Sequence, residues 1–244
     1  MEFIEFSSRC KEIFAFNQTI TQPNDEQIKK LFALTQRMLE VNKSMNLTAI
    51  TEENAVILKH YVDSVSISAL IPENATVIDI GCGAGFPCLP LAIFRPDVHF
   101  TALDSTAKRI DYVRSTAELL ELSNVTAIAG RAEEYANKQD FREKFDIATA
   151  RAVAALPVLS ELCLPFVKVN GSFIAMKASQ GESEAEAAKN AIKLCGGAPC
   201  VITKLCLTSN GTDSDERTVI KIFKSTPTPQ KYPRHFSQIS KKPL

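Results

Sequence analysis

From residue 75 onward, short apolar runs alternate with stretches of helical length, and this alternation restricts the possible folds more than any other feature of the chain. The apolar runs are 75–80, 98–103, 125–129, 145–150, 172–176, 199–207 and 217–223. Stretches with helical periodicity, such as 106–122 and 156–168, lie between them. Strands that are apolar on both faces and alternate with helices are typical of a mostly parallel sheet with helices on both sides. We therefore expect a doubly wound α/β fold with seven strands.

The last two apolar runs have no helix between them. Residues 208–216 contain Asn210, Gly211 and Asp213, which are common in tight turns. We therefore expect the last two runs to form an antiparallel hairpin at one edge of the sheet.

The first 72 residues are helical in character. Asn24 and Gln27 form a capping-box pattern before an apolar repeat, which predicts a helix over 24–47. A second helical pattern covers 51–70 and stops before Pro72. The sequence thus predicts a helical N-terminal cap at 1–72, an α/β domain at 73–224 and a tail at 225–244.

Composition excludes several classes of protein. The seven cysteines include no Cys-x-x-Cys pair and the three histidines are scattered, so we expect neither a disulfide framework nor a metal site. The most apolar segment, 152–169, contains two prolines and charged side chains, which makes it unsuitable as a membrane span. The first residues lack the basic start and the apolar stretch that are typical of a secretory signal. These features predict a cytoplasmic protein.

The charge is distributed unevenly. The chain has 28 basic and 28 acidic residues, but 221–244 hold six basic residues and no acidic one. That segment therefore carries +6 and the rest of the chain −6. A polyanionic partner is one interpretation and a solvated tail is the other. The proline content of the tail predicts an extended, mobile segment.

The strongest local motif is a strand followed by Gly81, Gly83 and Gly85. Such glycines let the backbone approach a ligand, and the helix that follows presents free N–H groups. Phe86 stands where the dinucleotide fingerprint requires its third glycine, which argues against NAD and FAD. Asp79 would repel a pyrophosphate but suits a ligand with an ammonium and a sulfonium group. S-adenosylmethionine is such a ligand, and a purely structural turn is the alternative.

Further candidate residues follow the next strands at the same sheet edge. Asp104 can accept hydrogen bonds from both ribose hydroxyls, or it can cap the helix that follows. Ala132 and Glu133 can flank an adenine ring. Arg151 and Lys177 end the fourth and fifth strands and suit a carboxylate or phosphate, although Arg151 could instead pair with Glu133 or Asp104.

Taken together, these motifs resemble the RsmG (GidB) family over nearly the whole chain. The resemblance is carried by Asn46-Leu47-Thr48, His60-x-x-Asp63-Ser64, the glycine loop through Pro87, Leu103-Asp104-Ser105, Lys108-Arg109, Arg131-Ala132-Glu133, Arg151-Ala152, Met176-Lys177 and Lys231-Tyr232-Pro233-Arg234. It implies a class I methyltransferase (Rossmann-like) fold that transfers a methyl group from S-adenosylmethionine to N7 of a guanosine in 16S ribosomal RNA. By the family pattern, the cofactor contacts are Gly81, Phe86, Ala132, Glu133 and Arg151. The chain departs from that pattern at Val41, Cys88 and Ala178.

The implied chemistry requires no acid or base. Guanine N7 has a free lone pair at neutral pH, so Arg151 and Lys177 are candidates for positioning rather than for proton transfer. The cysteine that methylation of cytosine C5 needs after the fourth strand is missing. A related methyltransferase acting on a protein or a small molecule is the alternative, and a nucleotide-binding module without catalysis is a third possibility.

The tail completes the predicted interface with RNA. Its cations can neutralise phosphates, while Tyr232 and Phe236 can stack on unpaired bases. The expected RNA contacts are Lys231, Arg234, Lys241 and Lys242. The expected partner is 16S ribosomal RNA or the small ribosomal subunit, bound by a monomer, and cofactor affinity should not depend on the tail.

Overall fold

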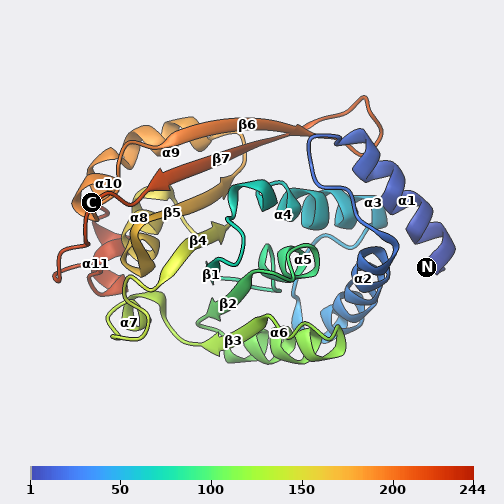
Figure 1. Ribbon diagram of the computed structural model, residues 1–244, viewed down its shortest axis with the longest axis horizontal. Helices are drawn as coiled ribbons and strands as arrows, with labels where there is room; N and C mark the ends of the chain where they lie inside the picture. The colour runs from blue at the N-terminus through green and yellow to red at the C-terminus, as the bar shows by residue number, and fades with distance from the viewer. Residues whose placement is uncertain (1) are drawn as a thin grey trace.

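The computed structural model describes residues 2–244, which contain one sheet of seven strands (Figure 1). The strands are β1 (Thr76–Ile80), β2 (His99–Asp104), β3 (Val125–Ala129), β4 (Phe145–Arg151), β5 (Val167–Lys177), β6 (Val201–Leu207) and β7 (Asp215–Phe223). Their order across the sheet is β3-β2-β1-β4-β5-β7-β6. Strands β1 to β5 pair in parallel, whereas β7 is antiparallel to both β5 and β6. The predicted doubly wound sheet with an edge hairpin is confirmed.

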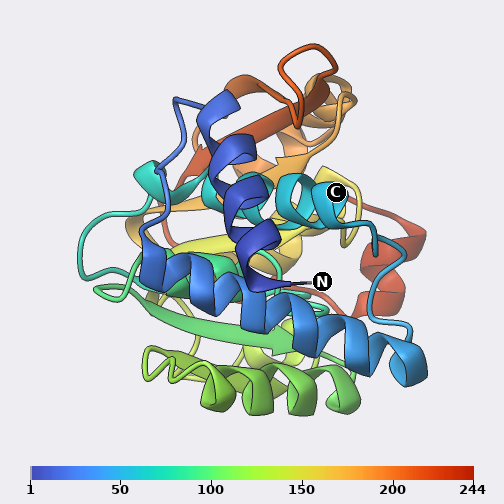
Figure 2. The same ribbon diagram turned by 90° about the vertical axis from the view of Figure 1, so that its right-hand side faces the viewer.

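Helices cover both faces of the sheet and bury two apolar clusters. The α-helices are α1 (Phe3–Phe16), α2 (Asp25–Met45), α3 (Glu53–Val56), α4 (Asp63–Val65), α5 (Cys88–Phe94), α6 (Ala107–Leu119), α7 (Ala132–Tyr135), α8 (Leu156–Cys163), α9 (Gly181–Ala187), α10 (Lys189–Leu194) and α11 (Phe236–Lys241). One cluster contains side chains from α1, α2, α5 and α6, and the other contains side chains from α8, α10 and α11. Helices α1 and α2 cross at one side of the molecule (Figure 2).

The N-terminal helices share a core with the sheet. The predicted capping box begins α2: Gln27 N–H donates to Asn24 Oδ1 at 2.8 Å, and Asn24 N–H donates to Gln27 Oε1 at 2.9 Å. Phe14 of α1 stacks on Phe94 of α5 with 5.8 Å between the ring centroids. Val77 of β1 belongs to the same buried cluster. Position 72 therefore marks a change of secondary structure inside one core.

The helix predicted over 51–70 is not regular. After α3, residues Ile57–Val62 form a π-helical stretch, followed by α4 and a 3-10 turn at Ser68–Leu70. A π-helical stretch of six residues is too short for side-chain periodicity to reveal it. Such stretches often occur at functional sites, and this one carries Lys59 and His60 toward the carboxyl ends of the strands.

Two other expectations are corrected. The helix predicted over 156–168 ends at Cys163, because the chain turns at Pro165 and β5 begins at Val167. The tail is folded rather than extended, since α11 packs against α8 and buries Ile239. Three of its four prolines lie before α11 and the fourth, Pro243, lies after it, so none interrupts the helix.

Candidate active site

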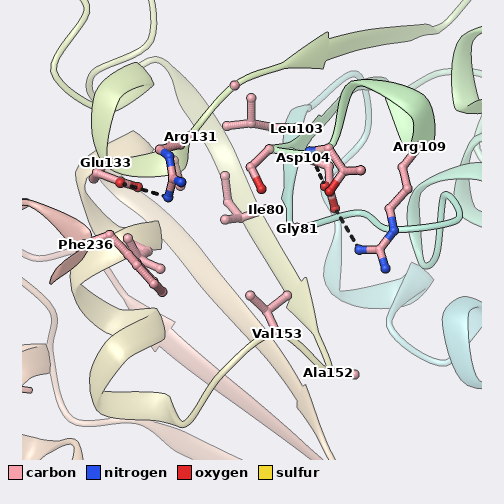
Figure 3. Close-up of a pocket in the computed structure, with 15 residues that line it drawn as sticks. Ile80, Gly81, Leu103, Asp104, Arg109, Arg131, Glu133, Ala152, Val153 and Phe236 are labelled. Carbon is pink, nitrogen blue, oxygen red and sulfur yellow. Dashed lines mark hydrogen bonds and ion pairs between the residues drawn. The ribbon is translucent and has the colours of Figure 1, made fainter. Parts of the chain in front are cut away.

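A cavity of about 320 Å³ opens at the carboxyl ends of β1, β2, β3 and β4 (Figure 3). This is the edge at which doubly wound sheets bind ligands, and the volume is within the range of small-molecule sites. The cavity is lined by Ile80, Gly81, Leu103, Asp104, Ser105, Thr106, Arg109, Gly130, Arg131, Ala132, Glu133, Ala152, Val153, Leu162 and Phe236. Four of the predicted cofactor residues, Gly81, Asp104, Ala132 and Glu133, are therefore brought together.

The three glycines of the loop have different surroundings. All three have positive φ, at 70° for Gly81, 56° for Gly83 and 86° for Gly85. A Cβ on Gly81 would lie 2.6 Å from Val153 Cγ2, and one on Gly85 would lie 2.5 Å from Leu89 Cδ1. A Cβ on Gly83 would meet open space, with its nearest neighbour 4.0 Å away. A glycine is therefore needed at position 85 so that Leu89 can pack against the backbone. At position 83 the glycine leaves the outer surface of the loop free of side chains.

Asp104 links the glycine loop to the next strand. Its buried carboxylate accepts hydrogen bonds from Gly83 N–H at 3.0 Å and from Thr106 N–H at 2.8 Å. Arg109 lies 3.9 Å from the same group. Each carboxylate oxygen can accept more than one hydrogen bond, so Asp104 can still receive ribose hydroxyls. The residues present thus fit a nucleoside.

Two predicted cofactor residues lie beneath the loop instead of along the cavity. Asp79 is buried, and its Oδ1 accepts a hydrogen bond from Thr149 Oγ1 at 2.9 Å. Desolvation raises the pKa of this carboxyl to about 7. Phe86 is also buried, and its ring stacks on His60 with 4.3 Å between centroids. A direct cofactor contact by either side chain stays a prediction.

A second cavity, of about 610 Å³, adjoins the first. Ala152 and Val153, which follow β4, border both cavities. Ala152 has a φ of 55°, a left-handed conformation that is uncommon for a residue with a side chain and often found at functional sites. The second cavity is lined by Ile50, Lys59, His60, Asp63, Arg151, Ala152, Val153, Ala154, Ala155, Met176, Lys177, Ala178, Glu184 and Arg217.

Asp63 organises the cations of this second cavity. It is buried and accepts hydrogen bonds from Arg151 at 2.7 Å and from Arg217 at 3.1 Å. Arg151 also donates to the carbonyl of Lys59 at 3.0 Å. Arg151 therefore pairs with neither Glu133 nor Asp104, the partners that the sequence suggested, and it lines the second cavity rather than the first.

Two more side chains are held in place at this cavity. Lys177, a predicted positioning residue, pairs with Glu184 at 2.7 Å and donates to the carbonyl of Ala154. His60 Nε2 lies 3.1 Å from Thr48 Oγ1, while its Nδ1 is buried without a partner in the described residues. Desolvation, reinforced by the charge of Arg151, lowers the pKa of His60 to about 3. His60 is therefore neutral at physiological pH.

The predicted RNA contacts in the tail fall into two groups. Lys231, Lys241 and Lys242 are exposed. Arg234 instead donates to Glu161 at 2.6 and 2.8 Å, and the side chain of Glu161 has no exposed surface. The guanidinium of Arg234 neutralises this buried carboxylate, and an RNA contact by Arg234 stays a prediction.

Residues 27–210 match the model of a protein family, GidB, which is described as rRNA small subunit methyltransferase G. The chain belongs to the GidB family. A small-subunit methyltransferase G of Acetivibrio thermocellus is 46% identical over 222 residues, which cover 91% of this chain and 90% of the relative. The corresponding protein of Staphylococcus saprophyticus is 45% identical and covers 91% of this chain and 92% of the relative.

Solved structures support the fold of this GidB member. A SAM-dependent O-methyltransferase from Thermotoga maritima superposes with a TM-score of 0.53 at 13% identity, covering 80% of this chain and 73% of that one. TYW2 of M. jannaschii, solved in complex with AdoMet, also gives a TM-score of 0.53, at 17% identity, and covers 67% of this chain and 75% of that one. Among residues 2–244, no helix has both the length and the apolar character needed to cross a membrane.

Some residues of the two cavities could not be assigned a role from the sequence alone. Asp63 and His60 lie in the His-x-x-Asp-Ser motif, but nothing in the sequence indicated that Asp63 holds Arg151. The sequence places Arg217 only at the start of a strand. Phe236 was interpreted as a contact for RNA bases, yet it lines the first cavity.

Proposed function

We propose that this protein transfers a methyl group from S-adenosylmethionine to N7 of a guanosine in 16S ribosomal RNA of the small subunit. The observation that carries the proposal is the meeting of two cavities at Ala152 and Val153. Methyl transfer needs a donor and an acceptor on either side of one short gap. The first cavity provides the nucleoside site and the second provides a cationic site for RNA.

The first cavity would hold the cofactor along the ends of three strands. Gly81 and Gly83 let the methionine part lie against the loop, Asp104 accepts the ribose hydroxyls, and Ala132 with Glu133 borders the adenine. The bound cofactor supplies an activated methyl group on its sulfonium. Asp79 lies beneath the loop, where its ionised form would attract the positively charged groups of the cofactor.

The second cavity would hold the target nucleotide. Asp63 fixes the guanidinium groups of Arg151 and Arg217, which can donate to guanine O6 and to phosphate oxygens. Lys177 adds a third cation. Because the pKa of His60 is about 3, His60 is unsuited to accept and return a proton near neutral pH, which agrees with a reaction that needs none. Catalysis would therefore depend on orientation and electrostatics.

The surroundings of the site suit a large anionic substrate. Lys231, Lys241 and Lys242 are exposed on the tail and can contact phosphates outside the cavities. We propose that the protein acts as a monomer on ribosomal RNA or on the assembled subunit in the cytoplasm.

Transfer of a labelled methyl group tests the proposal. The purified protein is incubated with labelled S-adenosylmethionine and with small subunits, free 16S RNA or a mixture of cell proteins, all from cells that lack the modification. We expect label in 16S RNA, at a guanosine where borohydride and aniline cleave the chain as they do at N7-methylguanosine. Subunits that already carry the modification serve as the control. Label found only in protein or in small molecules would refute the proposal.

A further inference from the structure

The C-terminal segment supplies a wall of the first cavity. Among the described residues of segment 225–244, Phe236 alone lines this cavity. It is the first residue of α11. Figure 3 shows its ring on the same side of the cavity as Glu133, away from Arg109. The residue is 40% exposed, although its side chain is large and apolar. One part of its surface therefore faces the place where a ligand would lie.

Buried anchors on both sides hold Phe236 in this place. Two residues earlier, Arg234 binds Glu161 through its side chain, and its backbone N–H donates to the same carboxylate at 2.8 Å. Three residues later, Ile239 is fully buried in the cluster with α8. Because the chain is fixed on both sides, the position of the ring is set before any ligand arrives.

Helix α8 connects the anchor to the cavity. It carries Glu161, which binds the tail, and its next residue, Leu162, lines the same cavity as Phe236. The tail and the cavity wall are therefore attached to one rigid element. Lys231, Lys241 and Lys242 of the tail, in contrast, are exposed and do not line this cavity.

We propose that Phe236 stacks on the adenine of S-adenosylmethionine, which makes the C-terminal segment part of the cofactor site. The inference rests on the cofactor named in the proposed function. A ligand that starts at Gly81 and places its ribose at Asp104 brings its base to Ala132 and Glu133, where the ring of Phe236 lies. Stacking of an aromatic side chain on a base is a substantial part of nucleoside affinity. Cofactor affinity thus depends on the tail, contrary to the expectation from the sequence.

Calorimetry with S-adenosylhomocysteine tests this role. We expect Phe236→Ala to weaken binding about tenfold or more, and Phe236→Tyr to retain most of the affinity. Phe223→Ala is the matched control, because Phe223 is 44% exposed at the end of β7 and lines neither cavity. S-ribosylhomocysteine, which lacks the base, should bind wild type and Phe236→Ala equally.

A fluorescent variant gives an independent reading. The chain has no tryptophan, so Phe236→Trp introduces a single emitting indole at the proposed contact. Its emission should change on addition of S-adenosylhomocysteine, but not on addition of S-ribosylhomocysteine. Equal affinity of wild type and Phe236→Ala for S-adenosylhomocysteine would refute the stacking role alone. A wild-type protein that binds neither S-adenosylmethionine nor its product would refute the cofactor assignment itself.

Discussion

The imidazole of His60 lies flat on the ring of Phe86, with 4.3 Å between the centroids and 8° between the planes. This stack joins the π-helical stretch to the glycine loop. It therefore connects His60, which lines the second cavity, to Phe86, which lies beneath the loop at the first cavity. Burial between these elements is what lowers the pKa of His60 to about 3.

His60 should therefore stay neutral in the folded protein over the physiological range. We expect its ring C–H signals in NMR to remain constant from about pH 8 down to about pH 4.5, because protonation would place a charge in a desolvated site. The signals are assigned by their loss in His60→Gln. A titration near the ordinary histidine pKa would contradict the burial described here.

Asp79 should make stability fall as pH rises. The pKa of its carboxyl is about 7 in the folded protein, against an ordinary value of 3.8 for aspartate, so the folded state binds more protons between these values. Its contribution is most favourable in acid and is lost as the pH rises toward 7. His60 has the opposite effect, because its lowered pKa costs stability below about pH 6.5.

Substitution separates these opposing effects. The free energy of unfolding of Asp79→Asn, relative to wild type, should increase by about 2–4 kcal/mol between about pH 4 and pH 8, since the variant no longer buries a charge. Urea unfolding across that range measures the difference. A relative stability that does not depend on pH would show that Asp79 has an ordinary pKa.

Asp63→Asn should impair methyl transfer without weakening cofactor binding. The variant loses one charge that holds Arg151 and Arg217, so we expect KM for subunits to rise about tenfold, equivalent to about 1.4 kcal/mol. S-adenosylhomocysteine affinity should stay the same, because Asp63 does not line the first cavity. Glu182→Gln, which breaks an exposed pair with Lys204 and lines neither cavity, is the control. Equal losses in the two variants would argue against a special role for Asp63.

The loop glycines should respond differently to substitution. Gly83→Val adds a side chain in the open space above the loop, so we expect cofactor binding to be lost. The positive φ of Gly83 should also cost the variant about 1–2 kcal/mol of stability. Gly85→Ala overlaps Leu89 and should mainly reduce stability. Calorimetry and thermal unfolding distinguish the two effects. Unchanged cofactor affinity in a folded Gly83→Val protein would mean that the loop is only a turn.

The exposed lysines of the tail should set part of the salt dependence of RNA binding. Replacing Lys231, Lys241 and Lys242 by Gln should flatten the log–log slope of affinity against salt by about 2, if each contacts one phosphate of unpaired RNA. Cofactor affinity should not change, in contrast to Phe236→Ala. A slope equal to that of wild type would show that these lysines face only solvent.

The parts of the structure that local patterns encode could be predicted. The strands, the edge hairpin and the capping box at Asn24 follow from apolar periodicity and turn chemistry, which act over a few residues. The strand-end residues Asp104 and Glu133 could also be placed, because parallel strands bring their carboxyl ends to one edge.

Contacts between distant segments could not be predicted in the same way. Asp63 and Arg217 are 154 positions apart and meet only because β7 inserts beside β5. Glu161 and Arg234 are 73 positions apart, and no periodicity in the tail indicated that Arg234 would be bound to a buried carboxylate. The prolines of the tail therefore suggested a mobile segment, although its fold depends on a partner in α8.

The shared border at Ala152 and Val153 has a consequence for inhibitor design. Because the two cavities are contiguous, a nucleoside joined by a short linker to a guanine-like group can occupy both at once. Once one half is bound, the other is confined near its own site at a high effective concentration, so affinity can increase by orders of magnitude without new contacts. Such a compound would also discriminate against proteins that offer a nucleoside site without a cluster like that of Arg151 and Arg217 around Asp63.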